Sequence, residues 1–248
     1  MYSYENKIYI ALVGGIIVLL VLVIFFVVTI LRYHRRKVAF NLEKLKADFD
    51  QLDQERERIA ADLHDDLGSV LSAVKLHLQR VEPRDEKSNA ILRFSEDQLD
   101  KSVNTLRRIA FNMMPGVLHR KGLEEALTEL INLMTDASSI AVKVQYKADN
   151  GISHANAIHI YRIAQEMMHN IVKHSKASRV SFSILKNKNR VELRIADNGI
   201  GFDKKLFINN SPGLGMRNIK ARAEVLNAKI SLVTMPGKGT NFLINIPL

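Results

Sequence analysis

The most constraining feature of the sequence is an uninterrupted apolar run near its beginning. Residues 8–31 (IYIALVGGIIVLLVLVIFFVVTIL) comprise 24 residues without one charge. As a helix this run would extend about 36 Å, which exceeds the roughly 30 Å hydrocarbon core of a bilayer. A cleaved signal peptide would have a shorter apolar region and a small-residue cleavage site, whereas here the basic segment RYHRRK follows directly. The sequence therefore predicts an uncleaved transmembrane anchor.

The charges that flank the run predict its orientation. Arg32, Arg35, Arg36 and Lys37 follow it, whereas Lys7 is the single basic residue before it. By the positive-inside rule, we expect a single-pass protein of the inner (cytoplasmic) membrane whose C-terminal domains lie in the cytoplasm. Residues 1–37 would form the anchor and a basic juxtamembrane segment.

Composition narrows the classes of partner and site. The net charge of +10 is spread over many segments and shows no basic stripe interleaved with aromatic residues. We therefore expect lipid headgroups as the acidic partner and no direct nucleic-acid binding. The chain has no cysteine, which excludes disulfides, Cys-based zinc sites and thiol nucleophiles.

Two amphipathic helical segments follow the anchor. From residue 38 to about 81, apolar residues recur at steps of three and four with charges between them, which predicts one long helix. EPRDEKS (82–88) interrupts it, and a second periodic run ends at MPG (114–116). Two helices bury too little apolar surface alone, so we expect a hairpin over 38–115 that forms a four-helix bundle with a second copy. The sequence thus predicts a homodimer.

The pattern changes to mixed helix and strand from residue 116 to 248. Consecutive strands joined by short turns pair antiparallel, so we expect an α+β, or α/β two-layer sandwich, with helices on one face. The predicted elements are, in order, a helix near 122–136, a strand at 141–148, a helix at about 154–175, strands at 179–185 and 190–196, a helix after Gly215, and strands at 229–234 and 240–246.

One histidine stands in an unusually open setting. In ERERIAADLHDDLGS, His64 has Ala60, Ala61, Leu67 and Gly68 as its neighbours one helical turn away. Three of these four side chains are too small to cover an imidazole. The ring is therefore expected to be accessible to another group.

Polar residues gather on one face of the helix at about 154–175. In isolation, this is the pattern of an ordinary surface helix. The face opposite to it, which we expect to be buried, carries Ile160, Ile163, Ala164, Met167 and Ile171, and the polar face carries Arg162, Glu166, Asn170, Lys173 and His174.

Three glycine-containing segments follow this helix. Asp197 ends a strand and precedes Gly199 and Gly201, which places a carboxylate beside backbone without Cβ atoms and suits an adenine amine, although Asp-Asn-Gly is also a common hairpin turn. SPGLGMRN (211–218) opens a helix whose N–H groups suit phosphate, and it matches neither a Rossmann fingerprint nor a P-loop. PGKGTNF (236–242) forms a tight turn between the last two strands.

The order N-x-x-K-H, D-x-G-x-G, G-x-G and G-x-G-T resembles the Bergerat-fold ATPase domain of the GHKL superfamily. Together with ERERIAADLHDDLGS and LRRIAFNMMPGVLHRKGLEEAL, it makes residues 50–248 resemble a sensor histidine kinase of two-component systems, of the NarX/DesK-like branch. The resemblance implies autophosphorylation with ATP and Mg²⁺, followed by transfer of the phosphoryl group to an aspartate on the receiver domain of a response regulator.

The resemblance also implies a role for each matching residue. His64 would be the phosphoacceptor and Asp65 the acid that takes or orients its proton, while Asn170 would be the Mg²⁺ ligand. Gly213 and Gly215 would hinge a short lid at about 203–213 over the nucleotide. The full ATP-binding set would be Glu166, Asn170, Lys173, His174, Asp197, Gly199, Gly201, Gly213, Gly215, Gly239 and Thr240.

Two positions depart from the family pattern. Ser69 stands where related proteins often carry a glutamine that is tied to dephosphorylation of the partner, so we do not expect phosphatase activity. Asn227-Ala228 stands where glycine is frequent, a mild change because asparagine tolerates the left-handed conformation. The remaining histidines show no metal-ligand spacing and are expected at the surface or between domains: His34, His77, His119, His154, His159 and His169.

Two other functions fit the same fold. The chain would be a degenerate scaffold if it bound nucleotide without turnover, or a GHKL ATPase if it hydrolysed ATP or phosphorylated serine in another protein. The intact Asn170, Asp197 and glycine set disfavours the scaffold, and the His64-Asp65 pair disfavours the ATPase.

Overall fold

The computed structural model describes residues 2–113, 116–135, 140–148, 151–205 and 213–248. The chain divides into two compact units, residues 1–48 and 49–248. Most of the predicted lid at 203–213 lies outside the described residues, and so does Pro115. The domain boundary predicted between residues 115 and 116 therefore stays a prediction.

The first helix is much longer than expected. α1 runs from Tyr2 to Asp62, so the prediction of a separate helix that begins at residue 38 was wrong. The physical reason is that residues 32–62 contain neither glycine nor proline, and nothing stops the helix. Large apolar side chains at residues 16–17 and 19–31 of this helix are exposed, with Phe25 at 69%. By length and composition this is one candidate membrane span within the described residues.

The chain then folds into a helical hairpin. α1 passes into a π-helical turn, η1 (Leu63–Leu67), and then into α2 (Gly68–Leu78), which packs on α3 (Glu86–Met113). α3 begins inside EPRDEKS because the Asp85 carboxylate accepts the N–H of Ser88 at 2.7 Å and caps the helix. This bond lowers the pKa of Asp85. Large apolar side chains of the hairpin stay exposed in one copy of the chain: Leu67, Val70, Val74, Ile91, Phe94 and Ile109.

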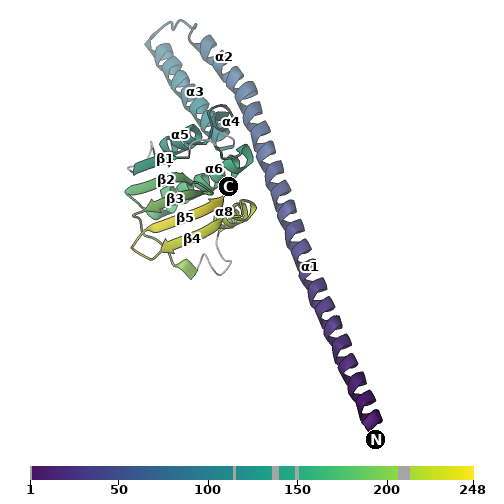
Figure 1. The fold of residues 1–248 in the computed structure, drawn as a ribbon. Coiled ribbons are helices and arrows are strands. Elements are labelled where there is room, and N and C mark those ends of the chain that lie inside the picture. Colours follow the sequence, from purple (N-terminus) through teal and green to yellow (C-terminus); the bar gives the residue numbers. More distant parts are fainter. Residues whose placement is uncertain (1, 114–115, 136–139, 149–150, 206–212) are drawn as a thin grey trace. The chain divides into compact units, whose positions relative to one another are not determined.

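The rest of the chain is a two-layer domain. Its five-stranded sheet has the order β1-β2-β3-β5-β4 and carries helices on one face (Figure 1). The elements are α4 (Gly116–Lys121), α5 (Leu123–Thr135), β1 (Ala141–Lys147), α6 (His154–Asn170), the π-turn η2 (Ile171–Ser175), β2 (Arg179–Asn187), β3 (Arg190–Asp197), α8 (Leu214–Val225), β4 (Lys229–Thr234) and β5 (Thr240–Pro247).

The sheet is mixed, and only part of its pairing follows short turns. β2 with β3 and β4 with β5 are antiparallel hairpins, as expected, and β3 also pairs antiparallel with β5. β1 instead pairs parallel with β2, with Val142 opposite Val180. The connection between them includes α6, and a helical crossover returns the chain in the same direction.

The predicted buried face of α6 is confirmed. Ile160, Ile163, Ala164, Met167 and Ile171 are all at most 7% exposed and belong to the core between helices and sheet. The prediction that Arg162 lies on a solvated polar face was wrong, since it is 4% exposed. Its guanidinium pairs with Asp53 of α1, which is far away in the sequence.

The turn before β4 has asparagine at a position where glycine is usual. Asn227 has φ 50°, in the left-handed region. Its N–H donates to Glu224 at 3.0 Å, and the N–H of Ala228 donates to Ala223 at 2.8 Å. This is the Schellman pattern that ends a helix and usually requires glycine. The expectation that asparagine serves here is confirmed.

A substitution pair at Asn227 tests this account of the turn. Asn227→Ala is expected to lower the free energy of unfolding by about 1 kcal/mol, because a Cβ without a compensating polar group is disfavoured in the left-handed region. Asn227→Gly is expected to match or exceed the wild type. Chemical denaturation of the two variants in detergent, followed by circular dichroism, measures the difference. Equal midpoints for Ala and Gly would contradict the turn geometry.

Candidate functional site

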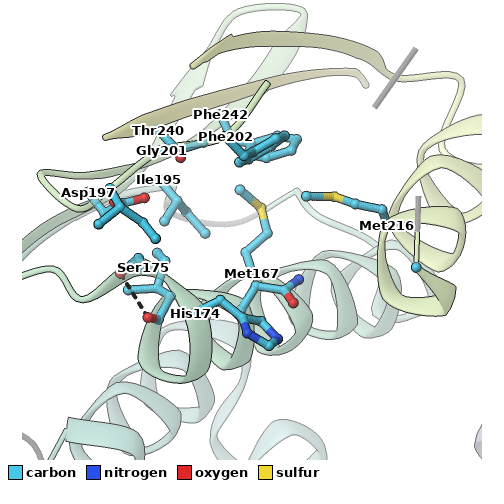
Figure 2. A pocket seen from close by; sticks show the side chains of 14 residues that line it. Met167, His174, Ser175, Ile195, Asp197, Gly201, Phe202, Met216, Thr240 and Phe242 are labelled. Carbon is cyan, nitrogen blue, oxygen red and sulfur yellow. Dashed lines mark hydrogen bonds between the residues drawn. The ribbon is translucent and has the colours of Figure 1, made fainter. Parts of the chain in front are cut away.

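A cavity of about 510 Å³ opens at one end of the two-layer domain (Figure 2). It lies between the C-terminal part of α6 with η2 on one side and β3, β5 and the start of α8 on the other. Six of the eleven residues of the predicted ATP-binding set line it: Asn170, His174, Asp197, Gly201, Gly213 and Thr240. The sequence segments that carry these residues thus meet at one place.

Most of the cavity wall is apolar. Met167 extends from α6 into the cavity, while Ile195, Phe202 and Phe242 come from the sheet side and Met216 from α8 (Figure 2). A concave, largely apolar space with a few polar groups is the usual form of a small-molecule site. Such walls suit a flat aromatic ring better than a charged group.

Asp197 supplies the carboxylate at the apolar part of the cavity. It ends β3, where it stands opposite Thr240 of β5, and its Oδ1 accepts the N–H of Gly199 at 2.8 Å. Burial raises the pKa of Asp197, while the bonds from Gly199 and the Thr240 hydroxyl act in the opposite direction. A carboxylate with spare acceptor capacity therefore faces an apolar space.

The glycines beside Asp197 permit close backbone approach. A Cβ on Gly199 would overlap the carbonyl oxygen of Ser175, and one on Gly239, where φ is +71°, would overlap that of Asp197. Gly201 makes a similar approach to Met235. The chain after Asp197 does not turn into a neighbouring strand, so the alternative of a simple hairpin turn was wrong. These glycines bring the loop after β3 against the β4–β5 turn.

Thr234 was missed by sequence reasoning. It is 6% exposed, and its Oγ1 accepts the N–H of Phe202 at 3.0 Å while lying 3.2 Å from the carbonyl oxygen of Gly239. It stands opposite Thr240 in the sheet, so Asp197, Thr240 and Thr234 form one row across β3, β5 and β4. Its hydroxyl joins the two loops beside the cavity. A threonine near a strand end is ordinary in sequence and gave no signal.

The polar end of α6 provides the other side of the site. Asn170 lines the cavity, and its side-chain amide donates to Glu166 Oε1 at 3.4 Å. Glu166 in turn contacts the start of α8, where a Cβ on Gly215 would overlap its carboxylate. Glu166 and Gly215 therefore shape the cavity from just outside it. Lys173 is exposed on η2 next to His174.

His64 and Asp65 lie on a different element. Both belong to η1, and Asp65 does not line the cavity. Asp65 lines a second, smaller groove of about 290 Å³ between the two helices of the hairpin, together with Ser69 and Arg107. A π-helical turn inside a long helix is rare and is frequently found at functional sites. The π-helical backbone therefore distinguishes the segment around His64 from the rest of the long helix.

Three of the remaining histidines lie where helices meet. The His119 and His154 rings are 4.4 Å apart, and His119 Nε2 is 3.2 Å from a carboxylate oxygen of Glu57. His159 is 3% exposed and contacts Arg222. His159 is thus buried between α1 and the two-layer domain, one of the two places expected for it, and it joins an ionic cluster outside the cavity.

Comparisons with known proteins match both parts of the chain. Residues 55–118 match the family described as "Histidine kinase", and residues 155–248 match the family described as "Histidine kinase-, DNA gyrase B-, and HSP90-like ATPase". These matches contain η1 with His64 and the cavity with Asp197, respectively.

Curated relatives match the chain across both domains. Sensor histidine kinase LiaS of Bacillus subtilis is 30% identical over 201 residues, covering 79% of this chain and 55% of that protein. Sensor protein VraS of Staphylococcus saprophyticus is 28% identical over 204 residues, covering 79% and 56%. The chain spans about half the length of these relatives. Among solved structures, the histidine kinase domain of a blue-light activated kinase from Erythrobacter litoralis aligns with 79% of this chain and 94% of that one at 16% identity, with a TM-score of 0.47.

The two family matches occur in one chain, in the same order as the hairpin and the two-layer domain. The relatives named as sensor kinases cover both matched regions. The chain belongs to the sensor histidine kinase family, with a histidine kinase domain followed by a GHKL-type ATPase domain.

Proposed function

We propose that this protein is a histidine kinase that uses ATP and Mg²⁺ to phosphorylate its own His64 and then passes the phosphoryl group to an aspartate on a response-regulator receiver domain. The observation that carries the proposal is the cavity, in which one carboxylate, Asp197, ends an apolar slot whose other side holds Asn170 and the start of α8. This cavity would supply the nucleotide half of the reaction, and the histidine on a π-helical turn would supply the acceptor half.

Asp197 is proposed to select the base. Its carboxylate would accept the amine of adenine, whereas guanine presents a carbonyl oxygen at that position and would be repelled. The apolar walls formed by Met167, Ile195 and Phe242 would contact the ring faces. Burial of the carboxylate makes the discrimination stronger, because an unpaired charge in a dry site is costly.

The start of α8 and the end of α6 are proposed to hold the phosphates. α8 has Gly213 at its N-cap, a residue without a side chain that could accept a cap bond, so its first N–H groups are suited to phosphate oxygens. Lys173 and His174 would add positive charge on the η2 side. Mg²⁺ is a small cation that prefers oxygen ligands, and bound there it would neutralise phosphate charge. The side-chain oxygen of Asn170 fits this preference while its amide donates to Glu166.

His64 is proposed to act as the nucleophile. A neutral imidazole nitrogen attacks the γ-phosphorus, the bond to the β–γ bridging oxygen breaks, and ADP leaves. Asp65, the next residue on η1, would take or orient the proton of the other ring nitrogen. Small neighbours at Ala60, Ala61 and Gly68 leave room for the ATPase domain and later for a receiver domain.

The assembly and location follow from exposed surface. The apolar residues of α2 and α3 that one copy leaves exposed, such as Val70 and Phe94, support a four-helix bundle formed by a homodimer. The candidate span and the basic residues Arg32 to Lys37 support a single-pass anchor in the cytoplasmic membrane with the kinase domains in the cytoplasm. Direct binding to nucleic acid is not part of the proposal.

Labelling with γ-³²P ATP and Mg²⁺ tests the central reaction. The wild type is expected to gain acid-labile, base-stable label, and His64→Gln is expected to lose it with nucleotide binding intact. Asn170→Ala is expected to lower labelling by about 100-fold or more, since cation neutralisation dominates phosphoryl transfer. Nucleotide binding without label would favour a scaffold, and phosphate release without label would favour an ATPase.

The substitution Asp197→Asn is expected to change ATP affinity without lowering the stability of the fold. If the amide oxygen keeps the Gly199 bond, its NH₂ faces the adenine amine, so ATP affinity is expected to fall about 10- to 100-fold. The raised pKa means that the ionised carboxylate costs stability above that pKa, a cost that fades as pH falls through it. The variant is therefore expected to melt no lower than wild type at neutral pH. Calorimetric titration with ATP and thermal melting measure the two effects, and a large loss of stability would contradict this account.

Thr234→Val tests the residue that joins the two loops. Valine has the same shape but leaves the N–H of Phe202 without its acceptor, so ATP affinity is expected to fall about tenfold. Thr234→Ser keeps the hydroxyl and serves as the control, with affinity close to wild type. Titration with a fluorescent ATP analogue measures both. Equal affinities for Val and Ser would show that the hydroxyl does not position the loops.

A further inference from the structure

A cluster of buried polar side chains lies outside the cavity and has no part in the proposed chemistry. Asp53 comes from α1, His159 and Arg162 from α6, and Arg222 from α8. Each is at most 5% exposed. Burying charge is costly unless the charges are paired, so a cluster of this kind calls for a physical account.

One carboxylate holds two guanidinium groups. Arg162 Nε donates to Asp53 Oδ1 at 3.0 Å, and Arg222 Nη1 donates to Asp53 Oδ2 at 2.9 Å. A second bond runs from Arg222 Nη2 to Oδ1 at 3.3 Å. Phe49, one turn earlier on α1, places its ring 4.2 Å from the Arg222 guanidinium carbon. Asp53 is therefore the residue that allows two arginines of the ATPase domain to be buried against α1.

The same cluster reaches the other helix of the hairpin. Arg162 Nη1 donates to the carbonyl oxygen of Asn112 at 3.2 Å, and Nη2 donates to that of Met113. These are the last two residues of α3, where carbonyl groups lack partners within the helix. A single guanidinium thus connects α1, the end of α3 and α6.

Both arginines stand on the helices that wall the nucleotide cavity. α6 carries Arg162 and also Met167 and Asn170, and α8 carries Arg222 and also Met216. Arg162 precedes Asn170 by eight residues, about 12 Å along the helix. A change in the position of α1 at Asp53 would therefore act on both sides of the cavity.

The arrangement held by the cluster differs from the one that phosphoryl transfer requires. Transfer demands that the γ-phosphate lie in line with the attacking nitrogen of His64. In this structure η1 packs on α2 and α3, and Asp65, the residue after His64, lines the groove between the hairpin helices and not the nucleotide cavity. The ATPase domain must move to bring the two together, and the cluster opposes that movement.

We propose that Asp53 is the centre of a resting-state joint that holds the ATPase domain on α1 through Arg162 and Arg222, and that this joint opens before His64 is phosphorylated. The kinetic part of this inference rests on the proposed function, whereas the joint itself does not. Because α1 is one helix from Tyr2 to Asp62, the residue that closes the joint belongs to the same helix as the candidate membrane span.

Asp53→Asn in the full chain, reconstituted in nanodiscs, is the first test. Loss of the carboxylate removes the negative charge that both buried guanidiniums contact, so the initial rate of autophosphorylation is expected to rise about tenfold, within the usual range of such couplings. Asp50→Asn is the matched control, because Asp50 is an exposed carboxylate one turn away on the same helix. Its rate is expected to equal that of the wild type.

A second variant distinguishes release of the ATPase domain from misfolding of the protein. Arg222→Lys keeps the charge but not the two bonds to Asp53, so it is expected to raise the rate by less than Asp53→Asn. The double variant Asp53→Asn with Arg222→Lys is expected to match Asp53→Asn, since both changes open the same joint. Additive effects would show that the two residues act independently, which would overturn the joint.

A distance measurement tests the joint without using kinase activity. The chain has no cysteine, so Arg93→Cys on α3 and Glu224→Cys on α8, both exposed, give two spin-label sites per chain, and the labelled chain is mixed with excess unlabelled chain so that most dimers carry one labelled copy. Pulsed electron resonance is expected to show a narrow distance distribution that Asp53→Asn broadens and Asp50→Asn does not. An unchanged distribution in Asp53→Asn would overturn the joint. A broadened distribution with an unchanged or lower rate would overturn its resting role, and absence of histidine label in the wild type would overturn the proposed function alone.

Discussion

The candidate site depends on the close approach of two loops across the end of the sheet. The row formed by Asp197, Thr240 and Thr234 fixes the register of β3, β5 and β4, and the loops that follow these strands can meet because Gly199 and Gly239 carry no Cβ. A side chain at either position would push the loop away from the Asp197 carboxylate. The main role of these two glycines is therefore to let the loops pack closely against each other. This packing shapes the cavity that a ligand would contact.

The sequence predicted the elements of the ATPase domain well because its signals are local. Period-two alternation identified β2 and β3, and the apolar spacing of α6 identified the buried face that the structure confirms. Six residues of the predicted ATP-binding set meet in one cavity although they come from α6, η2, β3, the loop after β3, the residue before α8, and β5. Their order along the chain resembled a known family, and periodicity alone would not have joined them. The parallel pairing of β1 was not predicted, because nothing local in a single strand determines its partner.

Features that depend on distant residues were beyond sequence reasoning. Arg162 occupies a polar position on an amphipathic helix, and the partner that buries it, Asp53, is 109 residues away. His159 becomes a core residue for the same reason, since Arg222 covers it from another helix. Thr234 has an ordinary strand sequence, yet its hydroxyl holds a loop 32 residues away. In each case the polar group has its role because the fold buries it beside a distant partner. The sequence around the residue does not reveal that burial.

Two opposite uses of buried charge occur in this domain. Asp197 keeps acceptor capacity toward an apolar cavity, and burial raises its pKa, so the protein gives up stability to keep the carboxylate ready for a ligand. Asp53 is paired with the buried Arg162 and Arg222 and lies 3.9 Å from Arg56, so breaking one of its pairs is costly, whereas complete separation returns all of these charges to water. Because breaking one ion pair of Asp53 costs more than separating the whole cluster, the cluster favours two discrete positions of the ATPase domain, closed and open, over a continuous range of positions. That property suits a chain whose ATPase domain must leave one position on α1 before it reaches another.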